Sequence, residues 1–411
     1  MAEKVRGNAV IGQSGGPTAV INQSLVGVVL EERKHKHIDK LLGARHGVRG
    51  IVNDDYYELN KMPTELLERI ANTPAAALRS TRDKPDAAYC EKIFANFKKN
   101  NVRYFFYIGG NDSADTARIV HDLAKQENYD LQVFHIPKTI DNDLKVHDHT
   151  PGYPSAAKFV AAAFMGDNFD NRSLPGIKVD IVMGRNAGYL TAAAVLARQF
   201  DHDGPHLIYV PEAPVSEDKF IADVDRVFTK GKRCLIAASE GITGPDGKTW
   251  FERLAESQER DAHGNMQLSG SGALGDYMAD LIKRKLTPAG GKPPRVRADT
   301  FGYIQRSFPG CVSEVDSQEA RRVGEMAVRY SVEAGISGSV AMRRRPGPYY
   351  DIEYFLTPLS TVAKETKHMS PEYIEDANNI TQAFIDYVKP LVGRLPEIGS
   401  FDELKFPEPL E

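Results

Sequence analysis

The run Pro137 to Asp143 holds two carboxylates two residues apart, with a lysine and a threonine just before them. In order, the run contains Lys138, Thr139, Ile140, Asp141 and Asp143. An apolar run, Leu131 to Ile136, precedes these residues and predicts a buried strand. Polar groups that follow such a strand lie at the carboxyl edge of a sheet, where open α/β sheets bind ligands. A carboxylate beside a cation at that edge, near glycine-rich loops, indicates phosphoryl transfer.

Three glycine-bearing turns, each between an expected strand and an expected helix, offer backbone amides to a phosphate. They are Gly12 to Thr18, Gly109 to Ser113 and Met183 to Gly188. Glycine lets a backbone approach a ligand closely, and amides at the start of the next helix point at that ligand. One such turn is weak evidence, because these turns often need glycine for backbone reasons alone. Three in one chain favour a polyanion site. The first turn lacks the ending of a P-loop, which argues against a Walker-type ATPase.

Several side chains near these turns have both a functional and a structural interpretation. Asn111 and Asp112 can hold a divalent ion beside a phosphate, or Asp112 can cap the next helix. The guanidinium of Arg185 suits a phosphoryl group in transit, or a surface salt bridge. Glu240 can accept hydrogens from sugar hydroxyls, or stand as a solvated loop carboxylate. The run Tyr303 to Arg306, after an expected strand at Thr300 to Gly302, offers a hydroxyl and a cation.

The elements that must position these groups alternate between strand-like and helix-like patterns. Strands are expected at 9–11, 104–108, 133–136, 179–183, 207–210 and 235–238, and helices at 20–30, 90–97, 117–124 and 190–197. Alternation of this kind predicts parallel sheets covered by helices. The turn-rich segment Thr150 to Pro154 is a plausible crossing to a second domain. The stretch from Gly241 to Gly275 is polar and glycine-rich, which predicts loops with one short helix.

Composition limits the classes of function that this chain can have. With 411 residues it can form two packed domains, and 41% apolar and 26% charged residues are ordinary for a globular protein. The net charge of −4 gives no reason to expect nucleic acid or a membrane surface as a partner. Three isolated cysteines (Cys90, Cys234 and Cys311) predict structural thiols in a reducing cytosol. With neither a signal peptide nor a long apolar stretch at hand, a cytoplasmic location is expected.

Taken together, these segments resemble the phosphofructokinases, in the family's order and over roughly residues 8 to 345. The matching segments are Gly12 to Asn22, Arg79 to Arg82, Gly109 to Ser113, Pro137 to Asp143, Met183 to Arg185, Glu240, Arg297 and Tyr303 to Arg306. The resemblance implies two Rossmann-like three-layer α/β domains with the active site in the cleft between them. We expect a donor-binding domain at 1–152 with a return segment near 307–345, a sugar-phosphate domain at 153–306, and a helical extension at 346–411.

The resemblance also assigns roles and a cofactor, Mg²⁺. Asp141 is implied as the general base on a sugar 1-hydroxyl, and Arg185 as the group that stabilises the phosphoryl in transit. The donor site is implied to include Gly15, Gly16, Arg82, Asp112, Ser113 and Lys138. The sugar-phosphate site is implied to include Thr139, Ile140, Met183, Gly184, Glu240, Arg297, Tyr303 and Arg306, and the metal site Asn111 and Asp143. Because the family supplies the counterpart of Arg297 from a neighbouring subunit, a homodimer or homotetramer with shared active sites is expected.

Departures from the ATP-using members point to a different phosphoryl donor. Those members carry glycine at the positions of Asp112 and Lys138, and the Asp/Lys pair resembles the pyrophosphate-using branch. Asp112 adds bulk and negative charge where the α-phosphate of a nucleotide would lie, and Lys138 adds a cation beside a small anionic donor. One charge pair at ~4 Å is worth about 4 kcal/mol at an effective dielectric of 20. The expected reaction is therefore reversible phosphoryl transfer from pyrophosphate to fructose 6-phosphate.

Other departures and alternatives stay open at the level of sequence. Asn111 stands where many members have aspartate, and Tyr303 replaces a histidine of bacterial ATP-using members. The helix after Asn22 carries no effector-binding arginines, so allosteric control is not expected. The alternatives are an ATP-dependent phosphofructokinase, a lipid or NAD kinase of the wider superfamily, and a non-catalytic regulatory subunit or sugar-phosphate sensor. Sedoheptulose 7-phosphate is not excluded as a substrate.

Two features of the C-terminal third have no firm assignment. The cationic run Arg343 to Arg345 is typical of a solvated face, with a phosphate contact as the alternative. The segment Tyr349 to Ile374 can close the sugar pocket, and Lys364 to Lys367 can reach a phosphate.

Overall fold

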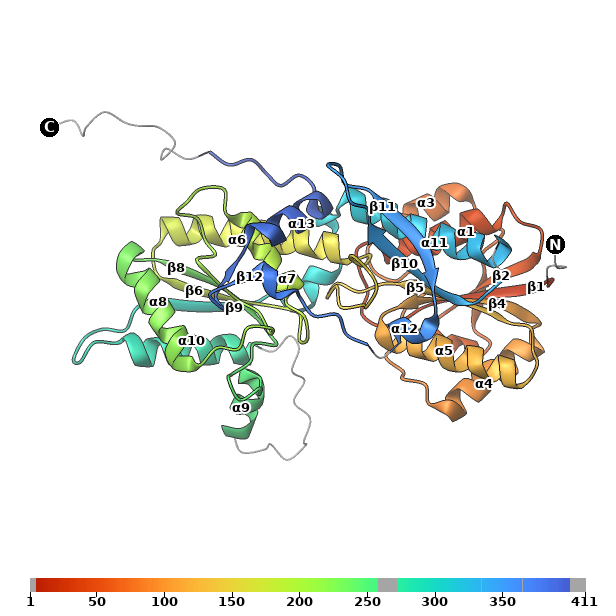
Figure 1. Cartoon of the computed structure of the whole chain (residues 1–411), viewed down its shortest axis with the longest axis horizontal. Coiled ribbons are helices and arrows are strands. Elements are labelled where there is room, and N and C mark those ends of the chain that lie inside the picture. Colours follow the sequence, from red (N-terminus) through yellow and green to blue (C-terminus); the bar gives the residue numbers. More distant parts are fainter. Residues whose placement is uncertain (1–4, 258–271, 334, 364, 400–411) are drawn as a thin grey trace.

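Two helix-covered sheets form the frame of the molecule (Figure 1). The computed structural model describes residues 5–257, 272–333, 335–363 and 365–399 of the chain. The first sheet has seven strands in the order β11-β10-β5-β4-β1-β2-β3, and the second has four in the order β7-β8-β6-β9. A two-stranded ribbon, β12 (Ile374–Glu375) with β13 (Asn379–Ile380), lies near the second sheet. The predicted α/β class, with mostly parallel sheets, is confirmed.

The first sheet is parallel through its five inner strands and antiparallel at both edges. Its strands are β1 (Gly7–Gln13), β2 (Ile38–Ala44), β3 (Tyr56–Glu58), β4 (Val102–Gly109), β5 (Gln132–Pro137), β10 (Gly338–Arg344) and β11 (Ile352–Thr357). Side chains alternate along β1, where Ala9 and Ile11 join one core and Val10 joins the other. Both faces are therefore buried, as a parallel sheet requires.

Helices cover the two faces of this sheet in separate groups. One core contains side chains of α1 (Ile21–Glu32), α3 (Thr64–Ala71) and α11 (Glu314–Glu333). The other contains side chains of α2 (Val48–Val52), α4 (Ala87–Lys99) and α5 (Asn111–Gln126). Cys90, Ile93, Phe94 and Phe97 all lie in this second core, at the helical spacing that the sequence predicts. The result is three layers, with the carboxyl ends of β1, β4 and β5 at one edge.

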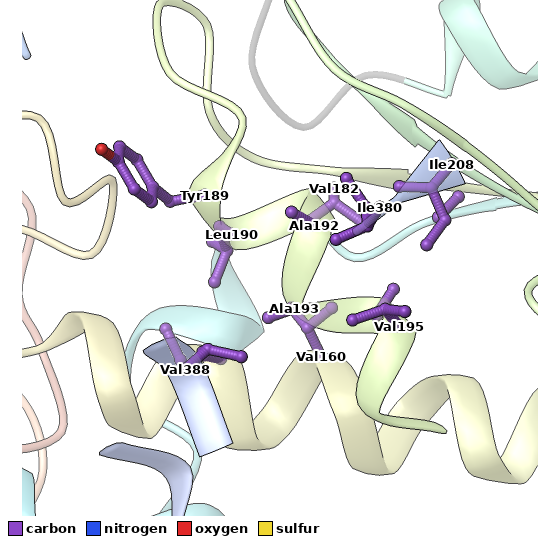
Figure 2. Packing of buried hydrophobic residues seen from close by; sticks show 14 of the residues in the cluster. Val160, Val182, Tyr189, Leu190, Ala192, Ala193, Val195, Ile208, Ile380 and Val388 are labelled. Carbon is purple, nitrogen blue, oxygen red and sulfur yellow. The ribbon is translucent and has the colours of Figure 1, made fainter. Parts of the chain in front are cut away.

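The second sheet is fully parallel and also has a core on each face. Its strands are β6 (Ile177–Val182), β7 (Leu207–Tyr209), β8 (Cys234–Ser239) and β9 (Val296–Thr300). On one face lie α6 (Tyr153–Ser173), α7 (Tyr189–Ala192), the 3₁₀ helix η1 (Ala193–Ala197) and α13 (Gln382–Val392), packed as Figure 2 shows. On the other lie α8 (Glu217–Gly231), α9 (Trp250–Ser257) and α10 (Ala273–Leu286).

The long helix α6 enters the second part of the molecule from the turn that sequence analysis singles out at Thr150 to Pro154. Asp316, at the start of α11, caps α6: its buried carboxylate accepts hydrogen bonds from the amides of Gly152 (2.8 Å) and Ser155 (3.0 Å) and from the Ser155 hydroxyl (2.6 Å). Gly152 has φ +105°, and a Cβ there would lie 2.6 Å from Thr18. This junction thus needs glycine and ties the two halves together.

Between Gly241 and Gly275 the chain forms loops and one short helix, α9, in keeping with the expectation, before α10 begins at Ala273. Residues 258–271 lie outside the described part. Two other expectations about elements are wrong. The expected strand at Thr300 to Gly302 ends at Thr300, and the 3₁₀ helix η2 (Gly302–Arg306) follows. The expected helical extension from 346 instead opens with β11, which completes the first sheet by pairing with β10.

The rest of the C-terminal region mixes short elements with one helix. After β11 come α12 (Leu359–Val362) and the 3₁₀ helix η4 (Pro371–Tyr373), and a further 3₁₀ turn, η3 (Pro309–Cys311), precedes α11. In the cationic run, Arg343 and Arg345 pair at the surface with Glu353 and Asp351. Arg344 differs, since its guanidinium reaches inward to the Asp148 carboxylate at 3.2 Å.

Candidate active site

A cavity of about 540 Å³ opens where the carboxyl ends of β1, β4 and β5 face the loop after β6. Of the predicted site residues, its lining includes Gly15, Gly16, Arg82, Asn111, Asp112, Ser113, Lys138, Thr139, Ile140, Asp141, Asp143, Met183 and Arg306. These residues come from six separate segments of sequence. The structure therefore brings the expected donor loops, the carboxylate pair and part of the expected sugar site into one space.

The carboxylate pair sits on a tight turn that starts where β5 ends. The Lys138 amide donates to the Gly109 carbonyl at 3.0 Å, so the turn is fixed to the end of β4. The Asp141 amide donates to the Thr139 hydroxyl at 3.1 Å. Asn142 adopts a left-handed conformation with φ +57°, which asparagine tolerates better than most residues. This reversal lets both neighbouring carboxylates line the cavity.

The electrostatic surroundings make Asp141 a weak acid. Burial is the main cause, and the nearby carboxylates of Asp143 and Glu240 add to it, so the pKa of Asp141 is raised to about 7. The charges of Arg306 and Lys138 oppose the shift. Burial also raises the pKa of Asp143, against a hydrogen bond from the Thr139 hydroxyl. A carboxylate that gains a proton near neutral pH suits a general base.

Lys138 places a buried ammonium group beside the first glycine-bearing turn. Its side chain is 4% exposed, and Nζ donates to the Gly16 carbonyl at 2.8 Å. Burial and the charges of Arg82 and Arg306 lower its pKa to about 8. The positive charges of Lys138, Arg82 and Arg306 repel each other across the cavity, so a bound polyanion would offset this repulsion.

The segment Arg79 to Arg82 lies directly against that first turn. The Gly15 amide donates to the Thr81 carbonyl at 3.1 Å, and the Ser80 hydroxyl donates to the Gly15 carbonyl at 2.6 Å. A Cβ on Gly16 would lie 3.1 Å from the Arg306 guanidinium carbon, so glycine there makes room for Arg306. Arg306 thus reaches across to the donor loop from the other side of the cavity.

The second turn opens α5 and presents Asn111, Asp112 and Ser113 in the first helical turn. Asp112 forms an ion pair with Lys84 at 3.0 Å, and both side chains are largely exposed. The amide group of Asn111 faces the carbonyls of Val362 and Glu365, at 3.2 and 3.0 Å, and donates to them when its nitrogen points that way. Its oxygen is then directed away from those carbonyls, as a metal ligand would require.

On the sugar side, Glu240 and Arg185 lie together at the margin of the cavity. The Arg185 Nε atom is 3.6 Å from a Glu240 carboxylate oxygen, and the Arg185 side chain is 57% exposed. Burial raises the pKa of Glu240, while Arg185 and the Gly184 amide oppose the shift. Gly184 has φ +126°. Neither Arg185, Gly184 nor Glu240 lines the described cavity, although the charge of Glu240 reaches Asp141.

Besides Gly184, Arg185 and Glu240, two further predicted residues do not line the cavity. Arg297, on β9, lines a separate small surface hollow with Lys178, Arg295 and Asp299. The ring of Tyr303 is 54% exposed and stacks under the Arg306 guanidinium at 4.4 Å. The contact between the Tyr303 ring and Arg306 could not be predicted from the sequence. It depends on the 3₁₀ helix η2, which places residues 303 and 306 on the same side.

Sequence reasoning misses several residues that line the cavity. Four of them lie inside the predicted segments, although the sequence did not identify these particular side chains: Ser14, Pro17, Thr81 and Asn186. Asp83 and Lys84 had no such signal, whereas Thr366 lies in the segment Tyr349 to Ile374, for which closure of the sugar pocket is expected. Asp83 and Lys84 directly follow the Arg79 to Arg82 segment, and this proximity was the available clue. Thr366 comes from the C-terminal region through an isolated bridge to Leu144.

No group of three His, Cys, Asp or Glu side chains in the described ranges is arranged to enclose a metal ion. Asn111, Asp141 and Asp143 all line the cavity and carry side-chain oxygens. This sparse set fits Mg²⁺, which keeps several waters and completes its shell with substrate phosphates. Within the same described residues, no helix combines the length and apolar content needed to cross a bilayer.

Comparison with known proteins identifies the family. The family described as "Phosphofructokinase" matches residues 8–331. The chain belongs to the phosphofructokinase family. A curated relative from Rhodospirillum rubrum, named pyrophosphate–fructose 6-phosphate 1-phosphotransferase, is 52% identical over 95% of each chain. A relative of the same name from Halomonas elongata is 34% identical, covering 94% of this chain and 91% of its own.

A solved structure supports the same placement. The pyrophosphate-dependent phosphofructokinase from Marinobacter aquaeolei matches with a TM-score of 0.82 and 31% identity, covering 97% of this chain and 94% of its own. The resemblance to the pyrophosphate-using branch, which rests on Asp112 and Lys138 in the sequence, is thus confirmed for this phosphofructokinase. The comparison extends beyond residue 345, so the C-terminal region also belongs to the shared architecture.

Proposed function

We propose that this phosphofructokinase transfers a phosphoryl group from pyrophosphate to the 1-hydroxyl of fructose 6-phosphate, giving fructose 1,6-bisphosphate and phosphate. The observation that carries the proposal is the placement of the buried Lys138 ammonium at the Gly16 carbonyl, in the same cavity as Asp141. A fixed cation at the donor loop suits a small polyanion that has no adenine to anchor it. Because the leaving group is phosphate, the reaction is readily reversible.

In the proposed mechanism the chain supplies a base, cations and a frame that orients the substrates. Asp141 accepts the proton of the sugar 1-hydroxyl while the hydroxyl oxygen attacks the phosphorus atom in line. Lys138 and Arg185 neutralise charge on the phosphoryl group in transit, and the Thr139 hydroxyl helps to bind it. Glu240, Met183 and Gly184 position the sugar. Arg306, supported by the Tyr303 ring, binds the 6-phosphate.

We also propose Mg²⁺ as the cofactor, held by Asp143 and Asn111 together with phosphate oxygens. When bound, the ion neutralises phosphate charge and orients the donor. The Asn111 amide contact with the carbonyls of Val362 and Glu365 supports this role, because it directs the remaining oxygen away from the C-terminal segment.

The remaining expectations complete the proposal. Residues 1–152 with 307–345 form the donor-binding domain, and 153–306 form the sugar-phosphate domain. The enzyme acts in the cytoplasm, without allosteric control, as a homodimer or homotetramer in which Arg297 reaches the active site of a neighbouring subunit. The exposure of Arg297 away from its own cavity supports this sharing.

Phosphorus NMR tests the proposed reaction directly. Purified enzyme with Mg²⁺, pyrophosphate and fructose 6-phosphate should convert the pyrophosphate signal into equal amounts of phosphate and a new sugar 1-phosphate signal. Starting from fructose 1,6-bisphosphate and phosphate, the pyrophosphate signal should appear. Loss of pyrophosphate without a sugar 1-phosphate would indicate simple hydrolysis and would contradict the proposal.

A further inference from the structure

The C-terminal segment Thr366 to Met369 runs between the catalytic turn and the loop after β6. On one side, the Lys367 amide donates to the Asp143 carbonyl at 2.7 Å. On the other side, a ring nitrogen of His368 lies 2.9 Å from the Asn186 carbonyl, and the Met369 amide donates to the Glu212 carboxylate at 2.9 Å. Four consecutive residues therefore bind both walls of the cavity.

The ammonium group of Lys367 does not face the cavity. Its Nζ donates to the Asn142 side-chain oxygen at 3.1 Å, to the His147 carbonyl at 3.1 Å and to the Asp148 carbonyl at 2.8 Å. It also lies 4.8 Å from the centre of the Tyr189 ring. These three bonds use all three ammonium hydrogens. The expectation that Lys367 reaches a phosphate is therefore wrong, and Lys364 lies outside the described residues.

Two of the acceptors, the carbonyls of His147 and Asp148, belong to the chain that follows the catalytic carboxylates, and the third, Asn142, lies between those carboxylates. Asn142 is fully buried, and its amide nitrogen donates to the Tyr387 hydroxyl at 2.8 Å. That hydroxyl in turn donates to the Asp148 carbonyl at 2.9 Å. Both ends of the Asn142 amide are thus held by residues more than 200 positions away in sequence.

We infer that Lys367 is a positioning residue for the phosphoryl transfer, acting through Asn142 to fix the left-handed turn that directs Asp141 and Asp143 into the cavity. The inference rests on the proposed function. An ammonium group that is partly withdrawn from water needs hydrogen-bond acceptors, and Lys367 donates all its hydrogens to Asn142 and to the chain that follows the catalytic carboxylates. Without it, the side-chain oxygen of Asn142 loses the donor that holds this residue in its left-handed conformation. The turn can then relax, and Asp141 moves away from the attacking hydroxyl.

The test compares Lys367→Met with the wild-type enzyme. Methionine keeps the length and apolar stem but removes all three donors. We expect kcat to fall ~10- to 100-fold, because a displacement on the order of 1 Å costs about that much, while KM for both substrates stays within ~3-fold. Lys389→Met, at an exposed position on α13, is the matched control and should keep wild-type kcat.

A second set of variants separates positioning from general support of the fold. Asn142→Gly keeps the left-handed backbone accessible but removes the side chain that Lys367 holds. If Lys367 acts through Asn142, the double variant Lys367→Met/Asn142→Gly should have a kcat no lower than that of the slower of these two single variants. Tyr387→Phe removes one hydroxyl from the same anchor and should lower kcat less, in the same direction. Multiplicative losses in the double variant would overturn the inference.

The outcomes distinguish this inference from the proposed function. A wild-type enzyme that is inert with pyrophosphate and fructose 6-phosphate would refute the function itself. An active wild type with Lys367→Met within twofold of its kcat would refute only the positioning role. If Lys367→Met does not fold, Tyr387→Phe and Asn142→Gly decide, and unchanged kcat in both would also refute it.

Discussion

At the scale of single residues, the shifted pKa of Asp141 has a direct kinetic consequence. Burial and two neighbouring carboxylates raise this pKa to about 7. A general base works only when deprotonated, so kcat should fall as pH falls from 8 to 6 through the raised pKa. An aspartate with an ordinary pKa of ~3.9 would stay deprotonated from pH 8 to 6, so kcat would not change over that range. A pH profile of kcat at saturating substrates measures this, and a flat profile would argue against Asp141 as the base.

Donor choice is also decided at single residues, by Asp112 and Lys138. Replacing both with glycine removes bulk and negative charge at one position and the donor-binding cation at the other. We expect Asp112→Gly/Lys138→Gly to lose at least ~10²-fold in kcat/KM for pyrophosphate and to gain measurable use of ATP. A coupled assay with each donor checks both effects. If the double variant still ignores ATP, other residues must block the nucleotide.

The structure refines this argument in one respect. Asp112 pairs with Lys84, so its negative charge is partly offset in the free enzyme. Exposed pairs of this kind contribute little to stability. The bulk of Asp112 is therefore the stronger argument against a nucleotide, and Lys84 is a further cation at the donor end of the cavity. The sequence could not reveal this pair, because the two residues are distant along the chain and Lys84 lies outside the recognised motifs.

At the scale of elements, the junction between α11 and α6 should carry a large share of stability. Asp316 accepts three hydrogen bonds in a buried site at the start of α6. Asp316→Ala should lower the free energy of unfolding by about 2 to 4 kcal/mol, because it strands two amides and a hydroxyl without partners. Urea denaturation followed by circular dichroism measures the change.

The matched control for that experiment is Asp280→Ala. Asp280 is a helical aspartate whose side chain is 76% exposed and forms an ion pair with Lys283, one turn away. Its replacement should change the free energy of unfolding by less than about 0.5 kcal/mol. Equal effects of the two substitutions would contradict the capping role of Asp316.

Elements with a clear period were predictable, whereas those fixed by distant contacts were not. The strand at Leu131 to Ile136 and the α4 pattern from Cys90 to Phe97 follow from local sequence. Strand β11 does not, because its partner β10 decides whether residues 352–357 extend. The same limit applies to Thr366, whose place at the cavity depends on distant contacts such as its bridge to Leu144 and the bond from the next amide to the Asp143 carbonyl.

At the scale of the whole molecule, shared active sites can be tested by complementation. Asp141→Asn and Arg297→Ala should each be nearly inactive alone, with kcat/KM lowered at least ~10²-fold. If Arg297 serves a neighbouring subunit, a mixed dimer contains one intact site. Refolding or exchanging the two variants in equal amounts should then restore about a quarter of wild-type activity, since half of the dimers are mixed and each has one working site of two. No recovery, with mixed dimers verified, would contradict shared sites.

The organisation of the molecule was the most predictable level, because ordered motifs along the chain fix which loops must meet. Pro137 to Asp143, Gly109 to Ser113 and Gly12 to Thr18 end neighbouring parallel strands, so their convergence follows from the alternation of elements. The support of the catalytic turn by Lys367 and Tyr387 was not predictable, since it depends on how the C-terminal region folds back over both halves.

The central claim is that the cavity around Asp141 and Lys138 uses an inorganic donor in place of a nucleotide. The most direct test is a side-by-side measurement of kcat/KM for pyrophosphate and for ATP, with fructose 6-phosphate saturating and Mg²⁺ present. The account predicts a preference for pyrophosphate of at least ~10³-fold, equivalent to about 4 kcal/mol. Equal use of both donors, or a preference for ATP, would contradict it.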